Sequence, residues 1–225
     1  FRSEARAKSG LLRGREFSMK DLYSFHADEA SLAEFYERAK RSYLSVFKRM
    51  GLNSFVTEAS GGDFSKEHSH EFMVETSAGE DKTVLCRLCG YAENKEISET
   101  KNGGPCPKCP GGVAEVVTTS EVGNIFKLGT RFSEPLNLRY RDVSGALHPV
   151  IMASYGIGVD RLVGTIVEVH HDERGIIWPA SVAPASAHLL TLGEDEKVRA
   201  SAEKVYETLK KHGVEFNTLT VVNRE

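Results

Sequence analysis

Four cysteines in two Cys-x-x-Cys pairs carry the clearest chemical signal in the sequence. Cys86 and Cys89 form one pair, Cys106 and Cys109 form the other, and 16 residues lie between the pairs. Thiolates are soft, charged donors for Zn²⁺, and two intervening residues let both sulfurs of a pair reach one ion. Two disulfides or a redox pair are the alternatives. Because no secretory signal is visible, the spacing favours a structural zinc site with four protein ligands.

The first 17 residues combine arginines with an aromatic ring and a carboxylate. The residues concerned are Arg2, Glu4, Arg6, Arg13, Arg15 and Phe17. The planar guanidinium fork matches phosphate oxygens in pairs, and an aromatic face can stack on a purine. An ionised carboxylate can accept a hydrogen bond from an exocyclic amine. These groups are the parts of a nucleotide site, although a solvated hairpin with local ion pairs has the same composition.

A second candidate site lies at the glycine-punctuated stretch that ends in Arg161. Gly156 and Gly158 would let a ligand approach the backbone closely, and Arg161 at the start of a helix could reach a phosphate. The pattern does not match the dinucleotide-binding fingerprint. A simple turn from strand to helix is the alternative.

Periodicity predicts the elements that would position these groups. Apolar residues at spacings of three and four predict a helix over 28–50, with Ser31 and Glu34 as a capping box and Gly51 as its end. Residues 1–26 are expected to form two strands joined by a loop near 7–14. Further strands are expected within 52–66, 68–75, 114–119, 123–130, 136–143 and 147–154.

The remaining segments complete an antiparallel sheet and begin a second unit. A turn is expected at Ser144–Gly145 and a second helix over 159–170. The segment 176–184, with a tryptophan and two prolines, is interpreted as a linker. After it, a strand, a helix over 194–212 that ends at Gly213 and a second strand predict the start of a βαβ unit.

Composition bounds the class of protein. The chain has 225 residues, a formal net charge of −3, 40% hydrophobic and 27% charged residues. This balance is typical of a folded chain of one or two domains and argues against a uniformly basic coat for nucleic acid. No apolar run is long enough for a membrane-spanning helix. The first residue is Phe1, so we expect a piece of a longer chain.

Several of these segments carry a family resemblance. FRSEARAKSGLLRGREFSMKDLYSFH resembles motif 2 of the class II aminoacyl-tRNA synthetases, and MASYGIGVDRL resembles their motif 3. The extended motif 2, together with SHEFMV, YAEN, VGNIFKLGTRFSE and DERGIIWP in that order, is similar to bacterial-type prolyl-tRNA synthetase. The resemblance covers most of 1–184, and 185–225 resembles the start of that family's anticodon-binding domain.

The resemblance implies an α+β fold and an activity. Residues 1–183 would be the catalytic domain, an antiparallel sheet flanked by helices, with a zinc-ribbon-like insertion at 80–113. Residues 184–225 would begin an α/β anticodon-binding domain. The implied enzyme is cytoplasmic and homodimeric. It would make prolyl-adenylate from proline and ATP, with Mg²⁺ on the phosphates, and transfer the prolyl group to tRNA(Pro).

The resemblance also assigns roles around ATP. Arg2 and Arg161 are the implied catalytic residues, with Arg2 on the α-phosphate and Arg161 clamping ATP from the other side. Glu4 would bind the adenine amino group, and Phe17 would stack on the ring. Arg13 would contact the outer phosphates or the tRNA end.

Other implied positions lie on the central strands. Lys127 and Thr130 would lie near the ribose or the phosphates, and Glu71 near the metal-bound phosphates. The residues implied to line or flank the proline pocket are Met19, Asp21, Tyr23 and Ser154.

Two departures from the bacterial-type pattern matter. Only the short cysteine segment stands where many members carry a large editing domain. A proline pocket rejects the smaller alanine by only about 1–3 kcal/mol, so we expect mischarging that this chain does not correct in cis. Motif 1, which forms much of the family's dimer interface, is missing, so we do not expect the piece alone to be active.

Three alternatives stay open. The chain could be a non-catalytic paralogue, a synthetase for another amino acid or a zinc-ribbon module that binds nucleic acid. Contact of the ribbon with tRNA would use Arg87, Lys101 and Lys108, although isolated basic residues more often face solvent.

Overall fold

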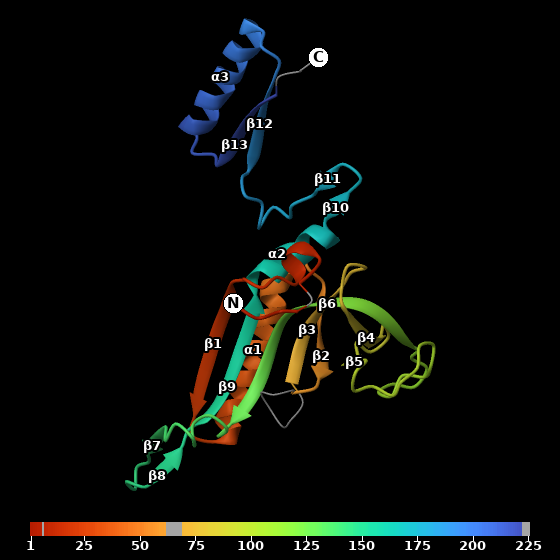
Figure 1. The fold of residues 1–225 in the computed structure, drawn as a ribbon, viewed down its shortest axis with the longest axis vertical. Helices are drawn as coiled ribbons and strands as arrows, with labels where there is room; N and C mark the ends of the chain where they lie inside the picture. The colour runs from red at the N-terminus through yellow and green to blue at the C-terminus, as the bar shows by residue number, and fades with distance from the viewer. Residues whose placement is uncertain (6, 62–68, 222–225) are drawn as a thin grey trace. The chain divides into compact units, whose positions relative to one another are not determined.

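The computed structural model describes residues 1–5, 7–61 and 69–221, so Arg6 and His68 lie outside it. The chain divides into two compact units, Phe1–Ile177 and Trp178–Glu225 (Figure 1). Each unit is considered by itself. The division falls inside the segment 176–184 that the sequence indicated as a linker.

An antiparallel sheet forms the centre of the first unit. Within the described residues it has seven strands in the order β1-β9-β6-β3-β2-β5-β4, antiparallel throughout except between β2 and β5. The strands are β1 Met19–His26, β2 Ser54–Ala59, β3 Ser69–Glu75, β4 Asp81–Cys86, β5 Ala92–Asn94, β6 Ala114–Gly129 and β9 Ile151–Gly158. This sheet confirms the expected antiparallel core.

One long helix, α1 (Glu29–Arg49), packs against the sheet, as the apolar period predicted. Its buried side chains are Leu32, Tyr36, Ala39, Tyr43 and Phe47. The predicted capping box is wrong, because Asp28 is the cap and its carboxylate accepts the Ser31 N–H at 2.8 Å. Gly51, at φ 80°, ends the helix as expected.

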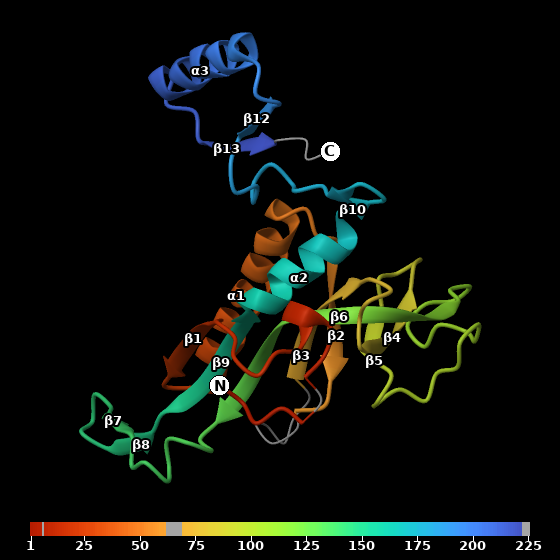
Figure 2. The same ribbon diagram turned by 45° about the horizontal axis from the view of Figure 1, so that its top comes forward.

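A second helix, α2 (Val159–Val169), follows β9 directly and packs on a short 3₁₀ helix, η1 (Gly10–Leu12) (Figure 2). Gly164 permits this packing, since a Cβ there would lie 3.1 Å from Leu12 Cδ2. Leu12 is buried beneath the helix. The loop of residues 7–14 is therefore fixed against the helix that carries Arg161.

The sequence analysis misplaced several strands. Two predicted strands are one continuous β6, because the segment between them is buried and pairs with β3. The first expected strand is absent from the described part of 1–17, where Lys8 and Arg13 form only an isolated bridge. The β7–β8 hairpin, Arg139–Arg141 with Leu147–Pro149, turns at Gly145 as predicted. A small unpredicted hairpin pairs β10 (His171–Asp172) with β11 (Gly175–Ile176).

The second unit has the expected βαβ connectivity. β12 (Ala187–Leu192) and β13 (Phe216–Val221) run parallel and are joined through α3 (Glu196–Lys211). Tyr206 of α3 packs edge-on against Phe216 with ring centroids 5.3 Å apart. Among the described helices of both units, none is both long and apolar enough to cross a membrane.

Candidate functional site

The strand register separates the two faces of the sheet. Tyr155 of β9 packs against Tyr36 of α1, so its neighbour Ser154 faces the side opposite α1. On β1, Tyr23 lies directly across from Ser154, and directly opposed residues share a face. The face opposite α1 therefore carries all four residues expected near proline, namely Met19, Asp21, Tyr23 and Ser154.

A hollow of about 710 Å³ opens on this face. Its lining includes Arg2, Glu4, Arg13, Phe17, Met19, Glu121, Asn124, Gly156, Gly158 and Arg161. The two stretches that the sequence indicated separately, at the two ends of the first unit, thus line one cavity. The cavity joins basic groups, a carboxylate and an aromatic ring, which are the groups that a nucleoside triphosphate needs.

Arg161 ties three segments together at this hollow. Its Nε donates to the Leu12 carbonyl at 2.9 Å, and its Nη1 donates to Glu121 Oε2 at 2.8 Å. The adjacent Asp160 carboxylate accepts the backbone N–H of Ser18. The start of α2 is thereby fixed to β6 and to two points, Leu12 and Ser18, of the stretch that precedes β1.

Arg2 and Phe17 already contact each other. The Arg2 guanidinium lies over the Phe17 ring at 5.2 Å from its centroid, within the range of a cation–π interaction. The Arg2 N–H also donates to the Arg15 carbonyl at 2.8 Å. Arg2 and Phe17 are therefore neighbours across the base of the loop, with a positive charge beside a flat apolar ring.

Arg13 lies between two carboxylates. Its Nε is 2.6 Å from Glu80 Oε2, and its Nη1 is 3.6 Å from Glu4 Oε2. A smaller hollow of about 330 Å³ adjoins this pair and is also lined by Asp81, Glu121 and Arg161. Two arginines and three acidic side chains thus meet beside the main cavity.

Carboxylates gather on the same face of the sheet. The register places Glu71 opposite Asn124, and Glu121 opposite Met73. The pKa of Glu71 is raised to about 8, first by burial and then by the charge of Glu121, while the Asn94 amide opposes this rise by donating to Glu71 Oε2 at 3.2 Å. Burial and Glu121 raise the pKa of Asp81 to about 6. The charges of Glu71, Asp81 and Glu121 therefore influence one another on this face of the sheet.

Lys127 and Thr130 do not reach the hollow. Side chains alternate along β6, so Lys127 faces α1, with its Nζ 5.5 Å from the centroid of the Tyr36 ring. Thr130 lies in the turn after β6, where its carbonyl accepts the Glu134 N–H. The resemblance-based placement of these two residues near ATP finds no support in this geometry.

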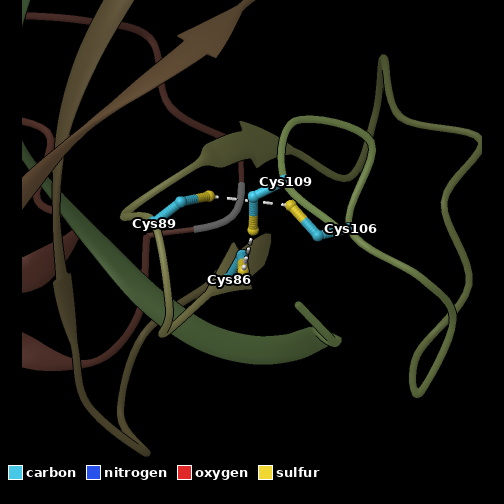
Figure 3. Close-up of side chains that lie close together, drawn as sticks. All are labelled: Cys86, Cys89, Cys106 and Cys109. Atoms are coloured by element: carbon cyan, nitrogen blue, oxygen red, sulfur yellow. Dashed lines mark hydrogen bonds between the residues drawn. The ribbon is translucent and has the colours of Figure 1, made fainter. Parts of the chain in front are cut away.

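The four cysteines converge on one point (Figure 3). All four sulfurs lie within 4.8 Å of one another, with Cys86 and Cys109 at 3.8 Å and Cys89 and Cys106 at 3.7 Å. A tetrahedral Zn²⁺ with bonds of about 2.3 Å places its sulfurs about 3.8 Å apart. A Cβ at Gly112 would lie 2.5 Å from Cys109 Sγ, so this backbone closes around the sulfurs. The donor set fits a tetrahedral metal.

The sequence analysis missed several site residues. Glu80, Asp81, Glu121 and Asn124 line the two hollows. Glu121 and Asn124 lie on the stretch of β6 that spans a predicted break. Glu80 and Asp81 precede the cysteine segment and were counted as part of it. The acidic character of the turn at 79–81 was the available signal.

Comparison with known proteins identifies a family and several relatives. Residues 1–170 match the family model described as tRNA synthetase class II core domain (G, H, P, S and T). Curated relatives include the proline–tRNA ligase of Maricaulis maris, 37% identical over 96% of this chain and 54% of its own, and that of Sulfurimonas denitrificans, 36% identical over 91% and 53%. A probable mitochondrial proline–tRNA ligase of Schizosaccharomyces pombe is 38% identical over 92% of this chain and 48% of its own.

A solved structure shares the fold. Prolyl-tRNA synthetase from Cryptosporidium parvum, complexed with L-proline and AMP, superposes with a TM-score of 0.68 at 16% identity, over 98% of this chain and 39% of that one. The chain spans about half the length of the curated relatives it matches. The hollow formed by its two arginine-bearing stretches and the family match over 1–170 lead to one conclusion: this chain belongs to the class II tRNA synthetase core-domain family.

Proposed function

We propose that this chain is the adenylation part of a proline–tRNA ligase. The observation that carries the proposal is the convergence of Arg2, Glu4, Phe17 and Arg161 on one hollow. The names of the curated relatives support proline as the amino acid. The enzyme would activate proline with ATP and pass the prolyl group to tRNA(Pro).

The proposed orientation of ATP follows from the residues that line the hollow. Adenine would stack on Phe17, while its amino group would donate to Glu4. The α-phosphate then lies near Arg2, and the outer phosphates lie toward Arg13 and Arg161. Glu80 and Glu121 balance the charges of Arg13 and Arg161 until the phosphates bind.

The reaction needs no protein nucleophile. A proline carboxylate oxygen attacks the α-phosphorus, the bond between the α-phosphorus and its bridging oxygen breaks, and pyrophosphate leaves. Arg2 and Arg161 neutralise the charge that develops on the phosphate oxygens and hold the reactants in line. Prolyl transfer to a hydroxyl at the tRNA end releases AMP.

Proline would lie on the adjoining part of the same face. That face carries Met19, Asp21, Tyr23 and Ser154. Gly156 of β9 lies directly across from Asp21 and leaves space beside it. Tyr23 is 54% exposed, so this part of the face is open to solvent in the described part of the chain.

Mg²⁺ would be held by the acidic cluster of Glu71, Asp81 and Glu121. When bound, Mg²⁺ would supply positive charge against the leaving pyrophosphate. The carboxylates of Glu71, Asp81 and Glu121 repel one another, which contributes to the raised pKa values of Glu71 and Asp81, and a cation would relieve this repulsion. Glu71 would give up its proton to bind the ion.

The four cysteines would hold a structural Zn²⁺ within the insertion at 80–113. We further propose residues 1–183 as the catalytic domain and 184–225 as the start of an anticodon-binding domain, supported by the βαβ connectivity of the second unit. A cytoplasmic homodimer is the proposed working form, and no editing domain interrupts the catalytic segment.

Substitution of Arg2 tests the proposed site. In the complete protein, Arg2→Ala should lower proline-dependent ATP–pyrophosphate exchange by about 100-fold or more, because a charge-neutralising donor at the reacting phosphate is lost. Arg87→Ala is the matched control, since Arg87 pairs with Glu75 and Glu115 away from the hollow. Near-normal exchange by a folded Arg2→Ala protein would remove Arg2 from the mechanism.

A further inference from the structure

Glu80 makes contacts that the roles assigned above do not use. One carboxylate oxygen lies 3.2 Å from Lys8 Nζ, and the other lies 2.6 Å from Arg13 Nε. Lys8 and Arg13 are the two ends of the loop beside the ATP hollow, and the Lys8 N–H donates to the Arg13 carbonyl at 3.1 Å. A single carboxylate thus bridges both ends of this loop from outside it.

The backbone holds Glu80 at that position. The preceding Gly79 donates its N–H to the Thr76 carbonyl and lies so close to β6 that a Cβ would be 2.2 Å from the Thr119 carbonyl oxygen. A side chain at residue 79 would therefore push the turn away from the sheet. Only 21% of the Glu80 side chain is exposed, so the carboxylate is held between the turn and the loop.

The loop itself needs outside support. Ser9 has φ 56°, a left-handed conformation that residues other than glycine rarely adopt. The middle of the loop is supported by the Arg161–Leu12 hydrogen bond and by the packing of Leu12 on α2. At the two ends of the loop, Lys8 and Arg13 pair with Glu80.

We propose that Glu80 is a positioning residue for the ATP-site loop. By pairing with Lys8 and Arg13 it keeps the two ends together and holds the Arg13 guanidinium at the mouth of the hollow. The contact with Glu80 uses the Nε of Arg13, an atom that is itself buried. The consequence for ATP rests on the proposed function, whereas the consequence for loop order does not.

Trypsin tests loop order without ATP, because Lys8, Arg13 and Arg15 are themselves cleavage sites. In the complete protein, Glu80→Gln should speed cleavage at these sites about fivefold, the range for two partly exposed ion pairs. Glu80→Asp, which keeps the charge, should restore slow cleavage. Glu75→Gln is the matched control, since Glu75 pairs with Arg87 instead of the loop. Cleavage after Arg41 and Lys48 of α1 monitors general unfolding of the same unit.

Exchange kinetics provide the second measurement. Glu80→Gln should raise KM for ATP about fivefold and change kcat much less, because Arg13 is misplaced before ATP binds. Unchanged loop cleavage, or faster cleavage with an unchanged KM for ATP, would overturn the proposal. If the wild-type protein shows no exchange, the proposed function fails, and the cleavage result alone decides whether Glu80 orders the loop. If Glu80→Gln does not fold, added salt should speed wild-type cleavage at Lys8 and Arg13, and salt-independent cleavage would contradict the role.

Discussion

At the residue scale, the pH dependence of stability should report the buried carboxylate of Glu71. Its pKa is raised from 4.5 to about 8, first by burial and then by Glu121. Between these values the folded protein holds a proton that the unfolded chain releases, so this group's stabilising contribution is complete below pH 4.5 and is lost as the pH rises toward 8. Glu71→Gln cannot ionise, and Gln still offers Asn94 an acceptor. The variant's Tm should therefore fall less than that of the wild type, by a few degrees, between pH 5.5 and 8.5.

Thermal unfolding across that pH range is the measurement. Glu75→Gln on the same strand is the control, because Glu75 is exposed and pairs with Arg87. Parallel curves for the wild type and Glu71→Gln would contradict the raised pKa.

The sequence motifs indicated Arg2 and Arg161 as candidate site residues, and both line the hollow. A motif could not show on which face of β6 Lys127 lies, because strand phase depends on bulges such as the one where β6 pairs with Phe72 and Met73 of β3.

At the element scale, the cysteine segment should depend on its metal. We expect about one Zn²⁺ per chain by elemental analysis, and we expect Cys106→Ser to lose it. Since β4 and β6 both lead from the cysteines to the acidic cluster, metal loss should lower Tm by about 5–15 °C. Leu88→Ser between the first two cysteines is the control, because Leu88 is 69% exposed. A metal-free wild type with intact stability, or paired disulfides, would refute the zinc site.

Helices and the antiparallel sheet could be predicted because apolar periodicity is a local property. The α1 helix followed its apolar face, and its cap was misassigned by three residues because Asp28 and Ser31 are both good caps. The single β6 strand could not be foreseen. The expected strands left 120–122 between them, before Gly123. A Cβ at Gly123 would lie 3.0 Å from the Gly156 carbonyl oxygen, so the glycine permits close strand packing.

At the scale of the whole molecule, the short insertion in place of an editing domain should affect how well the protein discriminates proline from alanine. The complete protein should charge tRNA(Pro) with alanine at a measurable rate and should not hydrolyse alanyl-tRNA(Pro) faster than buffer does. A pocket shaped for proline cannot strongly reject the smaller alanine, because the missing methylene groups lower the binding free energy by only about 1–3 kcal/mol. Hydrolysis assays with purified alanyl-tRNA(Pro) check this, with prolyl-tRNA(Pro) as control. Rapid and selective deacylation would contradict the absence of editing in cis.

The central claim is that the hollow activates proline. The most direct test is ATP–pyrophosphate exchange by the complete, zinc-loaded protein with each of the amino acids in turn. We predict strong exchange with proline, weaker exchange with alanine and little with the others. Exchange with a different amino acid, or no exchange from a folded protein, would contradict the account, and the second result would favour a non-catalytic member of the family.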